Sequence, residues 1–143
     1  MAAPTERPRT HPAERFAGAE HVLDLPAALE KLRAEGRRGD TTSSKGHRQI
    51  SLLHHGPVRM VLYAFDADGR LPEHGAPGWV TIHVLRGALE VRTSSARHTL
   101  REGQLLALAP DVRHDVHALE AAEMLLGVYP TVPTGTAGTV GGA

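Results

Sequence analysis

The segment from Leu71 to Ala118 is the feature of this chain that most restricts its fold. Short stretches in which apolar and polar residues alternate are separated there by glycine, proline and serine. Alternation is typical of strands with one buried face, and the separating residues are those that form turns. The segment therefore predicts a run of short strands. The histidines within it suggest a metal site, because imidazoles on the inner face of a small β-barrel can hold a divalent ion.

The rest of the chain adds one helix and further strands to this pattern. A helix is expected over Leu25–Glu35, because apolar residues recur there at helical spacing, Asp24 can cap its start and Gly36 can end it. One helix is too little to cover a parallel sheet, so the chain is predicted to be an all-β protein, a closed barrel or jelly roll. The expected strands are Gln49–Leu53, Val58–Phe65, Leu71–His74, Trp79–Leu85, Ala88–Thr93, Arg97–Leu100, Gln104–Leu108, Val112–Leu119 and Met124–Tyr129.

Length and composition limit the class of protein further. The 143 residues suffice for one domain, which we expect over residues 21–130, between a flexible tail at 1–20 and a disordered tail at 131–143. The 16 Lys and Arg balance the 16 Asp and Glu, and aromatic residues make up only 3%, which argues against a nucleic-acid surface. No apolar run reaches bilayer length. The lack of cysteine excludes disulfides and fits the cytoplasmic location that we expect.

Strand parity indicates which histidines point into the barrel. In Val112–Leu119, His114 shares a face with Val116, while His117 lies on the opposite face. The apolar face belongs in the interior, so we expect His114 inside and His117 outside. His74 precedes a Gly/Pro turn at the end of its strand, where the mouth of a barrel places ligand-binding groups.

The strand Trp79–Leu85 leaves the direction of His83 open. Val80 and Ile82 lie on one face of this strand, and His83 lies on the other. The simplest assignment turns the valine face inward and His83 outward. A β-bulge at either end of the strand would reverse that assignment locally.

These residues resemble the two motifs of the cupin superfamily. The first motif, G-x5-H-x-H-x3-4-E-x6-G, is similar to residues 69–87, with His74 at its first histidine. The second motif, G-x5-P-x-G-x2-H-x3-N, is similar to residues 103–114, which end at His114. The resemblance covers about residues 48–129. It implies a cupin-type jelly-roll β-barrel, here preceded by one short N-terminal helix.

The resemblance also implies a way to hold a metal. In cupins that bind one, two histidines and the glutamate of the first motif join the histidine of the second. Only His74 and His114 match, since the other two positions fall on Ala76 and Val80. Two ligands are too few for a divalent ion, which normally needs three or more protein groups. A bulge that turned His83 inward would complete a three-histidine site for iron, manganese, nickel or zinc.

Two functions remain open at this point. In the first, a metal on the three histidines acts on a small organic molecule, in an oxygenase, isomerase, decarboxylase or cyclase reaction, with Glu73 or His98 as acid, base or further ligand. In the second, the barrel is metal-free and serves as a small-molecule binding or dimerisation module. The ten histidines and the retained His114 favour the first, and the two lost ligand positions favour the second. The residues expected to line the pocket are Met60, Leu62, Trp79, Val80, Ile82 and His98.

The strand Trp79–Leu85 also predicts self-association. It carries apolar residues on both faces, and such a strand must be covered on both. We therefore expect a homodimer, with the face formed by Trp79, His83 and Leu85 at or near the interface.

Overall fold

The computed structural model describes residues 19–39 and 45–131. The predicted tails at 1–20 and 131–143 lie almost entirely outside these ranges. The elements, in chain order, are α2 (Leu25–Arg37), β1 (His47–His55), β2 (Val58–Phe65), β3 (Arg70–His74), β4 (Trp79–Arg86), β5 (Ala88–Thr93), β6 (Arg97–Arg101), β7 (Leu105–Leu108), β8 (His114–Ala118) and β9 (Ala122–Tyr129).

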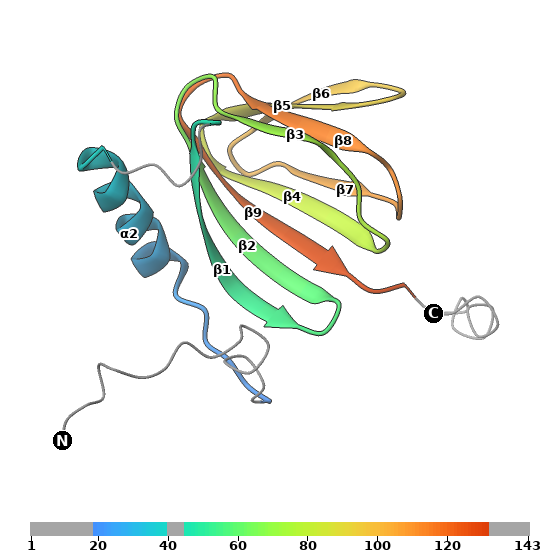
Figure 1. Cartoon of the computed structure of the whole chain (residues 1–143), viewed down its shortest axis with the longest axis horizontal. Coiled ribbons are helices and arrows are strands. Elements are labelled where there is room, and N and C mark those ends of the chain that lie inside the picture. Colours follow the sequence, from blue (N-terminus) through green and yellow to red (C-terminus); the bar gives the residue numbers. More distant parts are fainter. Residues whose placement is uncertain (1–18, 40–44, 132–143) are drawn as a thin grey trace.

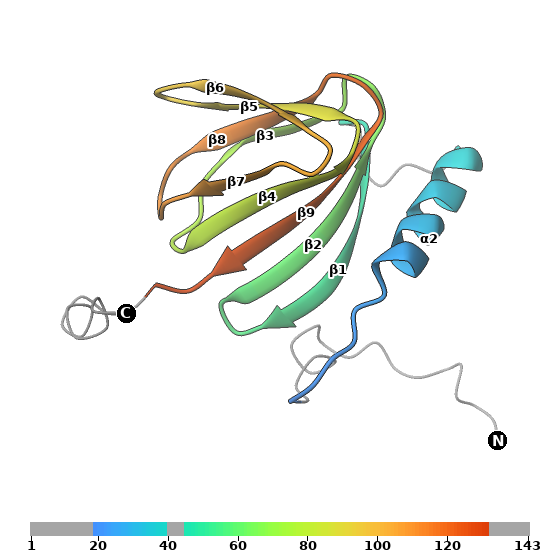
Figure 2. The same cartoon turned by 180° about the vertical axis from the view of Figure 1, so that it is seen from behind.

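The strands of the described ranges form two antiparallel sheets that face each other (Figure 1). The larger sheet has the order β1-β2-β9-β4-β7, and the smaller one has the order β3-β8-β5-β6. Helix α2 lies outside the two sheets, beside β1 and β2 (Figure 2). This arrangement confirms the predicted all-β jelly roll with one preceding helix. No helix of the described ranges is long and apolar enough to cross a membrane.

Helix α2 begins as the sequence predicts but ends later. The Asp24 carboxylate accepts a hydrogen bond from the Ala27 amide at 3.0 Å, which caps the first turn. The helix continues to Arg37, two residues beyond the predicted end, so Gly36 lies inside it. A Cβ at Gly36 would lie 3.0 Å from the Arg48 guanidinium. The glycine therefore serves the close packing of α2 on the barrel and does not stop the helix.

The main core lies between the inner faces of the two sheets. Alternate residues of each strand point into it, as strand geometry requires. Val80, Ile82 and Val84 of β4 are at most 3% exposed, which puts the valine face inward. The buried members of this cluster are Val61, Tyr63, Phe65, Leu71, Val80, Ile82, Val84, Leu89, Val91, Leu100, Leu108, Val116, Ala118, Ala122, Met124 and Leu126.

A second core cluster lies between α2 and the outer face of the larger sheet. Leu32 of the helix is fully buried there against Leu62 of β2, and Met60 packs at its margin. Met60 and Leu62 therefore point away from the barrel interior, and the prediction that they line the pocket is corrected. Strand β2 is apolar on both faces because both are covered, so its alternation does not tell inside from outside.

A buried ion pair joins the helix to the sheet. Glu123 of β9 is 2% exposed. The Nε and Nη2 atoms of Arg33 donate to its two carboxylate oxygens at 2.7 and 2.8 Å, and Arg86 lies 3.8 Å away. A bidentate arginine compensates the desolvation of a buried carboxylate better than a single contact does. The pair thus fixes the position of α2 across the outer face of the barrel.

Candidate functional site

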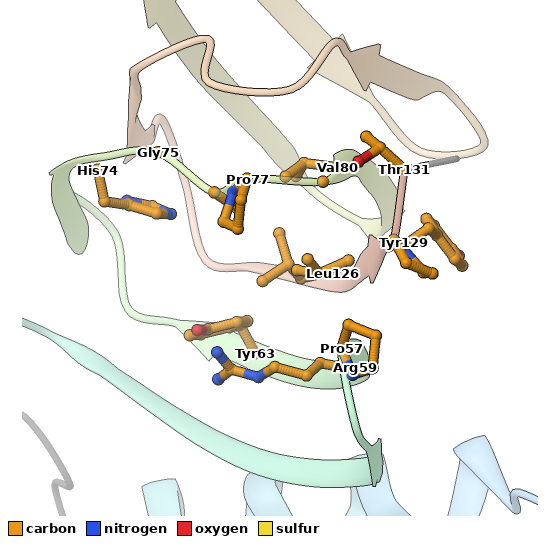
Figure 3. A pocket seen from close by; sticks show the side chains of 14 residues that line it. Pro57, Arg59, Tyr63, His74, Gly75, Pro77, Val80, Leu126, Tyr129 and Thr131 are labelled. Atoms are coloured by element: carbon orange, nitrogen blue, oxygen red, sulfur yellow. The ribbon is translucent and has the colours of Figure 1, made fainter. Parts of the chain in front are cut away.

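A pocket of about 540 Å³ opens at one end of the barrel, between the ends of β2, β4 and β9 and the loop after β3 (Figure 3). Its volume lies within the range of small-molecule sites in proteins. Its walls are mostly apolar, with few polar side chains among them. The lining residues are Pro57, Arg59, Tyr63, His74, Gly75, Ala76, Pro77, Gly78, Val80, Leu126, Val128, Tyr129, Pro130 and Thr131.

A close approach of two backbones shapes the mouth of this pocket. A Cβ at Gly78, just before β4, would overlap the carbonyl oxygen of Tyr129 at the end of β9. Only glycine allows the chain to pass there. The short loop after β3 is thereby held against the end of the larger sheet, where it forms one side of the pocket.

Two histidines meet beside the pocket. The β3–β8 ladder shifts register between Leu71 and His74, and the shift puts His74 opposite His114. Their ring centroids are 4.3 Å apart and the ring planes are inclined by 57°. His74 lines the pocket, while His114 lies behind it and is 1% exposed. The structure therefore brings together the two histidines that match the sequence motifs.

Both rings are oriented by backbone carbonyls. The Nδ1 atom of His74 lies 2.8 Å from the Pro72 oxygen, and that of His114 lies 3.1 Å from the Val112 oxygen. A carbonyl only accepts, so Nδ1 carries the proton in each neutral ring and Nε2 is left as an acceptor. The Nε2 atom of His114 is buried and has no partner among the described residues.

The electrostatic surroundings keep His114 neutral. Burial is the main cause that lowers its pKa below the ordinary 6.5, and the neighbouring His74 acts in the same direction. The hydrogen bond to the Val112 carbonyl acts in the opposite direction but is the smaller effect. His114 is thus held as a neutral imidazole at neutral pH.

His83 does not join this pair. Strand β4 does have a register shift, but it lies between Val84 and Arg86, after His83. His83 therefore stays on the outer face of the sheet, opposite Leu105 of β7 and Leu125 of β9. The bulge needed for a three-histidine site is in the strand but at the wrong place.

The weaker candidates do not join the pair either. Glu73 lies at the surface, 3.6 Å from Arg113. His98 lies opposite Val91 on the inner face of β6, the edge strand of the smaller sheet, and does not line the pocket. Across residues 19–39 and 45–131 no three His, Cys, Asp or Glu side chains are grouped so that they could hold a metal ion.

The predicted pocket lining is correct only in part. Val80 lines the pocket, whereas Ile82 is fully buried deeper in the core. Trp79 is 47% exposed and lies on the outer face with His83. With Met60 and Leu62 also outside, most of the predicted lining lies elsewhere.

Two pocket residues were missed by the sequence analysis. Arg59 and Tyr63 of β2 share the inward face of that strand with Val61. Tyr63 is 8% exposed, and burial raises the pKa of its phenol while the charge of Arg59 opposes that rise. One signal could have found them. Arg59 is the only charged residue of β2, and it shares the parity of Val61 and Tyr63, which point inward.

Comparison with known proteins finds one matching family model and several structures of similar fold. Residues 55–124 match the family model described as the AraC-like ligand binding domain. No curated protein matches the sequence. Among solved structures, a cupin superfamily protein from Desulfitobacterium hafniense is 14% identical with a TM-score of 0.59, over 64% of this chain and 84% of that one.

Two further structures agree with this likeness. An RmlC-like cupin from Shewanella frigidimarina is 16% identical with a TM-score of 0.57, over 64% of this chain and 82% of that one. A conserved Streptococcus pyogenes protein of unknown function is 21% identical with a TM-score of 0.58, over 64% and 80% of the two chains. At such identities the likeness concerns the fold.

Proposed function

Since this chain has the fold of known cupin proteins and its residues 55–124 match the AraC-like ligand binding domain, we propose that it is a metal-free module that binds a small organic molecule in the pocket at the mouth of its barrel. The observation that carries the proposal is the lining of that pocket. Apolar side chains surround it, and Arg59, Tyr63 and His74 supply the polar groups. This combination of apolar walls with a few convergent polar groups is typical of small-molecule sites. The match to a ligand-binding domain supports the same function.

The donor set argues against a resident metal. His74 and His114 would each offer an Nε2 atom, which is the right kind of ligand for zinc or iron. Among residues 19–39 and 45–131 no third ligand joins them, because the motif positions of the other two ligands carry Ala76 and Val80 and His83 lies on the opposite face of its sheet. We therefore derive no reaction step through a metal. In the proposed function His74 lies beside the ligand, where its neutral imidazole offers a hydrogen-bond acceptor, and His114 lies behind it.

The proposed function is tested by closing the pocket. Ala76 lies in the loop at the pocket mouth, so Ala76→Phe fills the pocket without cutting into a strand. The matched control is Ala109→Phe, at an exposed position in a loop that does not line the pocket. Ligand-observed NMR with a panel of small cyclic and aliphatic acids, amides and alcohols should give binders for the wild type and the control. The same compounds should not bind the Ala76→Phe protein, and equal binding to all three proteins would overturn the proposal.

We also propose that the protein is a homodimer that pairs through the outer face of β9, β4 and β7. Helix α2 contacts β1 and β2. On the remaining strands of that face, Trp79 is 47% and Leu105 is 55% exposed, and His83 lies between them in register with Leu105. Large apolar side chains gathered on one exposed sheet face are typical of protein interfaces. A second copy of the same face offers the same apolar surface in return.

A further inference from the structure

We propose that the ligand of this pocket is a small organic carboxylate, whose charged group binds at Arg59 and Tyr63. The inference rests on the proposed function, because it names the chemical class that the pocket takes. It depends on three features of the lining, which are its charge, the direction of its donors and its apolar walls.

The first feature is an uncompensated charge. Among the described residues that line the pocket, Arg59 is the only side chain with a permanent charge, and none is a carboxylate. Within the described ranges Arg59 has no ion pair, whereas six other arginines of those ranges each lie within 4 Å of an acidic side chain. An unpaired guanidinium at the wall of an apolar pocket attracts an anion into it.

The second feature is a pair of hydrogen-bond donors on one wall. Arg59 and Tyr63 lie on the same face of β2, and Figure 3 shows the guanidinium next to the hydroxyl end of Tyr63. The Tyr63 hydroxyl has no hydrogen-bond partner among the described residues, and its raised pKa leaves it a protonated donor at neutral pH. A guanidinium fork and a phenol together supply the donors that the two oxygens of a carboxylate accept.

The third feature fixes which way the ligand lies. His74 stands on the side of the pocket formed by the end of β3, and its Nδ1 atom is engaged with the Pro72 carbonyl. In the neutral ring the remaining nitrogen accepts and does not donate, whereas Arg59 and Tyr63 both donate to a carboxylate. Val80 and Leu126 also line the pocket and offer only apolar contact. The carboxylate is therefore expected at Arg59, with the apolar body of the ligand across Leu126.

Matched acids and amides separate the effect of charge from that of shape. Benzoate and benzamide, and hexanoate and hexanamide, are titrated into the full-length protein, and dissociation constants are taken from protein NMR shifts. Each acid should bind at least about tenfold more tightly than its amide, as a charge-assisted hydrogen bond implies. In Arg59→Gln that preference should disappear, and in Tyr63→Phe it should fall. Arg101→Gln removes the same charge at an exposed position on β6, outside the pocket, and should keep the preference.

The failures of the two proposals are distinguishable. If amides bind as tightly as acids to the wild type, and both are lost in Ala76→Phe, the pocket binds small molecules and the carboxylate inference is wrong. A preference for acids that persists in Arg59→Gln also overturns the inference. If neither acid shows saturable binding to the wild type at millimolar concentration, the inference is again wrong. The panel of neutral compounds then decides the proposed function by itself.

Discussion

The imidazoles of His74 and His114 stand with their ring centroids 4.3 Å apart across the β3–β8 ladder, and each points its Nδ1 atom at a backbone carbonyl of its own segment. This arrangement is half of a metal site, with two oriented donors and no third donor in the part of the chain that the structure describes. The cupin motif assigns the other two ligands to the positions of Ala76 and Val80. Both residues line the same pocket as His74, so the missing ligands correspond to two known positions of that pocket.

Restoring those two positions should create a metal site. The wild type, incubated with Zn²⁺ or Fe²⁺ and desalted, should retain far less than one equivalent, because two protein ligands do not hold a divalent ion tightly. The double variant Ala76→His/Val80→Glu should retain about one equivalent. Adding His114→Ala to the double variant should abolish that retention. Elemental analysis of protein purified without an affinity tag measures all three. Stoichiometric metal in the wild type, lost in His74→Ala and His114→Ala, would instead support the metal-dependent function.

Loss of Glu123 should destabilise the fold strongly. Glu123→Ala removes the buried partner of Arg33 and Arg86 and leaves two guanidinium groups at the edge of the α2 interface. Removing one member of a buried pair typically costs about 3–5 kcal/mol of unfolding free energy. Because Arg33 is 38% exposed, water relieves part of this cost, and we expect the lower end of the range. Urea denaturation measures the change.

The matched control is the exposed pair on the same helix. Arg37→Ala breaks the contact with Glu30, in which both side chains are at least 60% exposed, and should leave the stability nearly unchanged. A Glu123→Ala protein as stable as Arg37→Ala would show that the Arg33–Glu123 contact does not hold α2 in place.

Acid should destabilise the protein before its carboxylates titrate. Burial is the main cause that lowers the pKa of both His47 and His114 below the ordinary 6.5. Above that pH the two imidazoles are neutral in both states, and their contribution to stability does not change. As the pH falls through 6.5, the unfolded chain takes up protons that the folded chain does not. The free energy of unfolding therefore becomes smaller as the pH falls. Below the lowered folded values the loss levels off.

Chemical denaturation at pH 7.5 and 5.5 measures this loss. In His47→Gln the fall between the two pH values should be smaller than in the wild type, because one of the two groups no longer titrates. The control is His98→Gln, which removes a half-exposed histidine on β6 in place of a buried one. An equal loss of unfolding free energy between the two pH values in all three proteins would contradict the role of burial.

The proposed dimer is tested at the most exposed apolar residue of its face. Leu105→Asp puts a charge at a position that is 55% exposed, opposite His83, and should convert the dimer to a monomer. Leu119→Asp makes the same change at a residue that is 45% exposed in the turn before β9, away from that face, and should leave the dimer intact. Size-exclusion chromatography with light scattering reads the mass, and a wild type that elutes as a monomer at micromolar concentration would rule the proposal out.

The fold was predictable because its strands are short, alternating and separated by strong turn residues. The strand boundaries agree within about two residues, and the inward position of His114 follows from parity alone. Parity fails on β2, whose two faces are both covered, so Met60 and Leu62 were placed on the wrong side. The cytoplasmic location and the two tails stay predictions.

The site was predictable only where a motif marked it. His74 and His114 were marked, but their contact depends on a register shift in β3 that no local pattern signals. Arg59 and Tyr63 carry no motif, and they reach the pocket only because β2 pairs with β9 and curves toward the loop after β3. Their role depends on long-range packing, which the periodicity of a single strand does not contain.

Residues 55–124, which match the family model, are not expected to fold by themselves. This segment starts at His55, the last residue of β1, and stops at Met124, the third residue of β9. Strand β9 is the middle strand of the larger sheet, so a fragment with those limits would lose the seam between β2 and β4. The fragment would also lack α2, which covers the outer face of β2, and most of β1, which pairs with its edge. An exposed apolar strand with an unpaired edge promotes aggregation. Anyone who shortens this protein for study should keep the chain from α2 through β9 and the pocket residue Thr131.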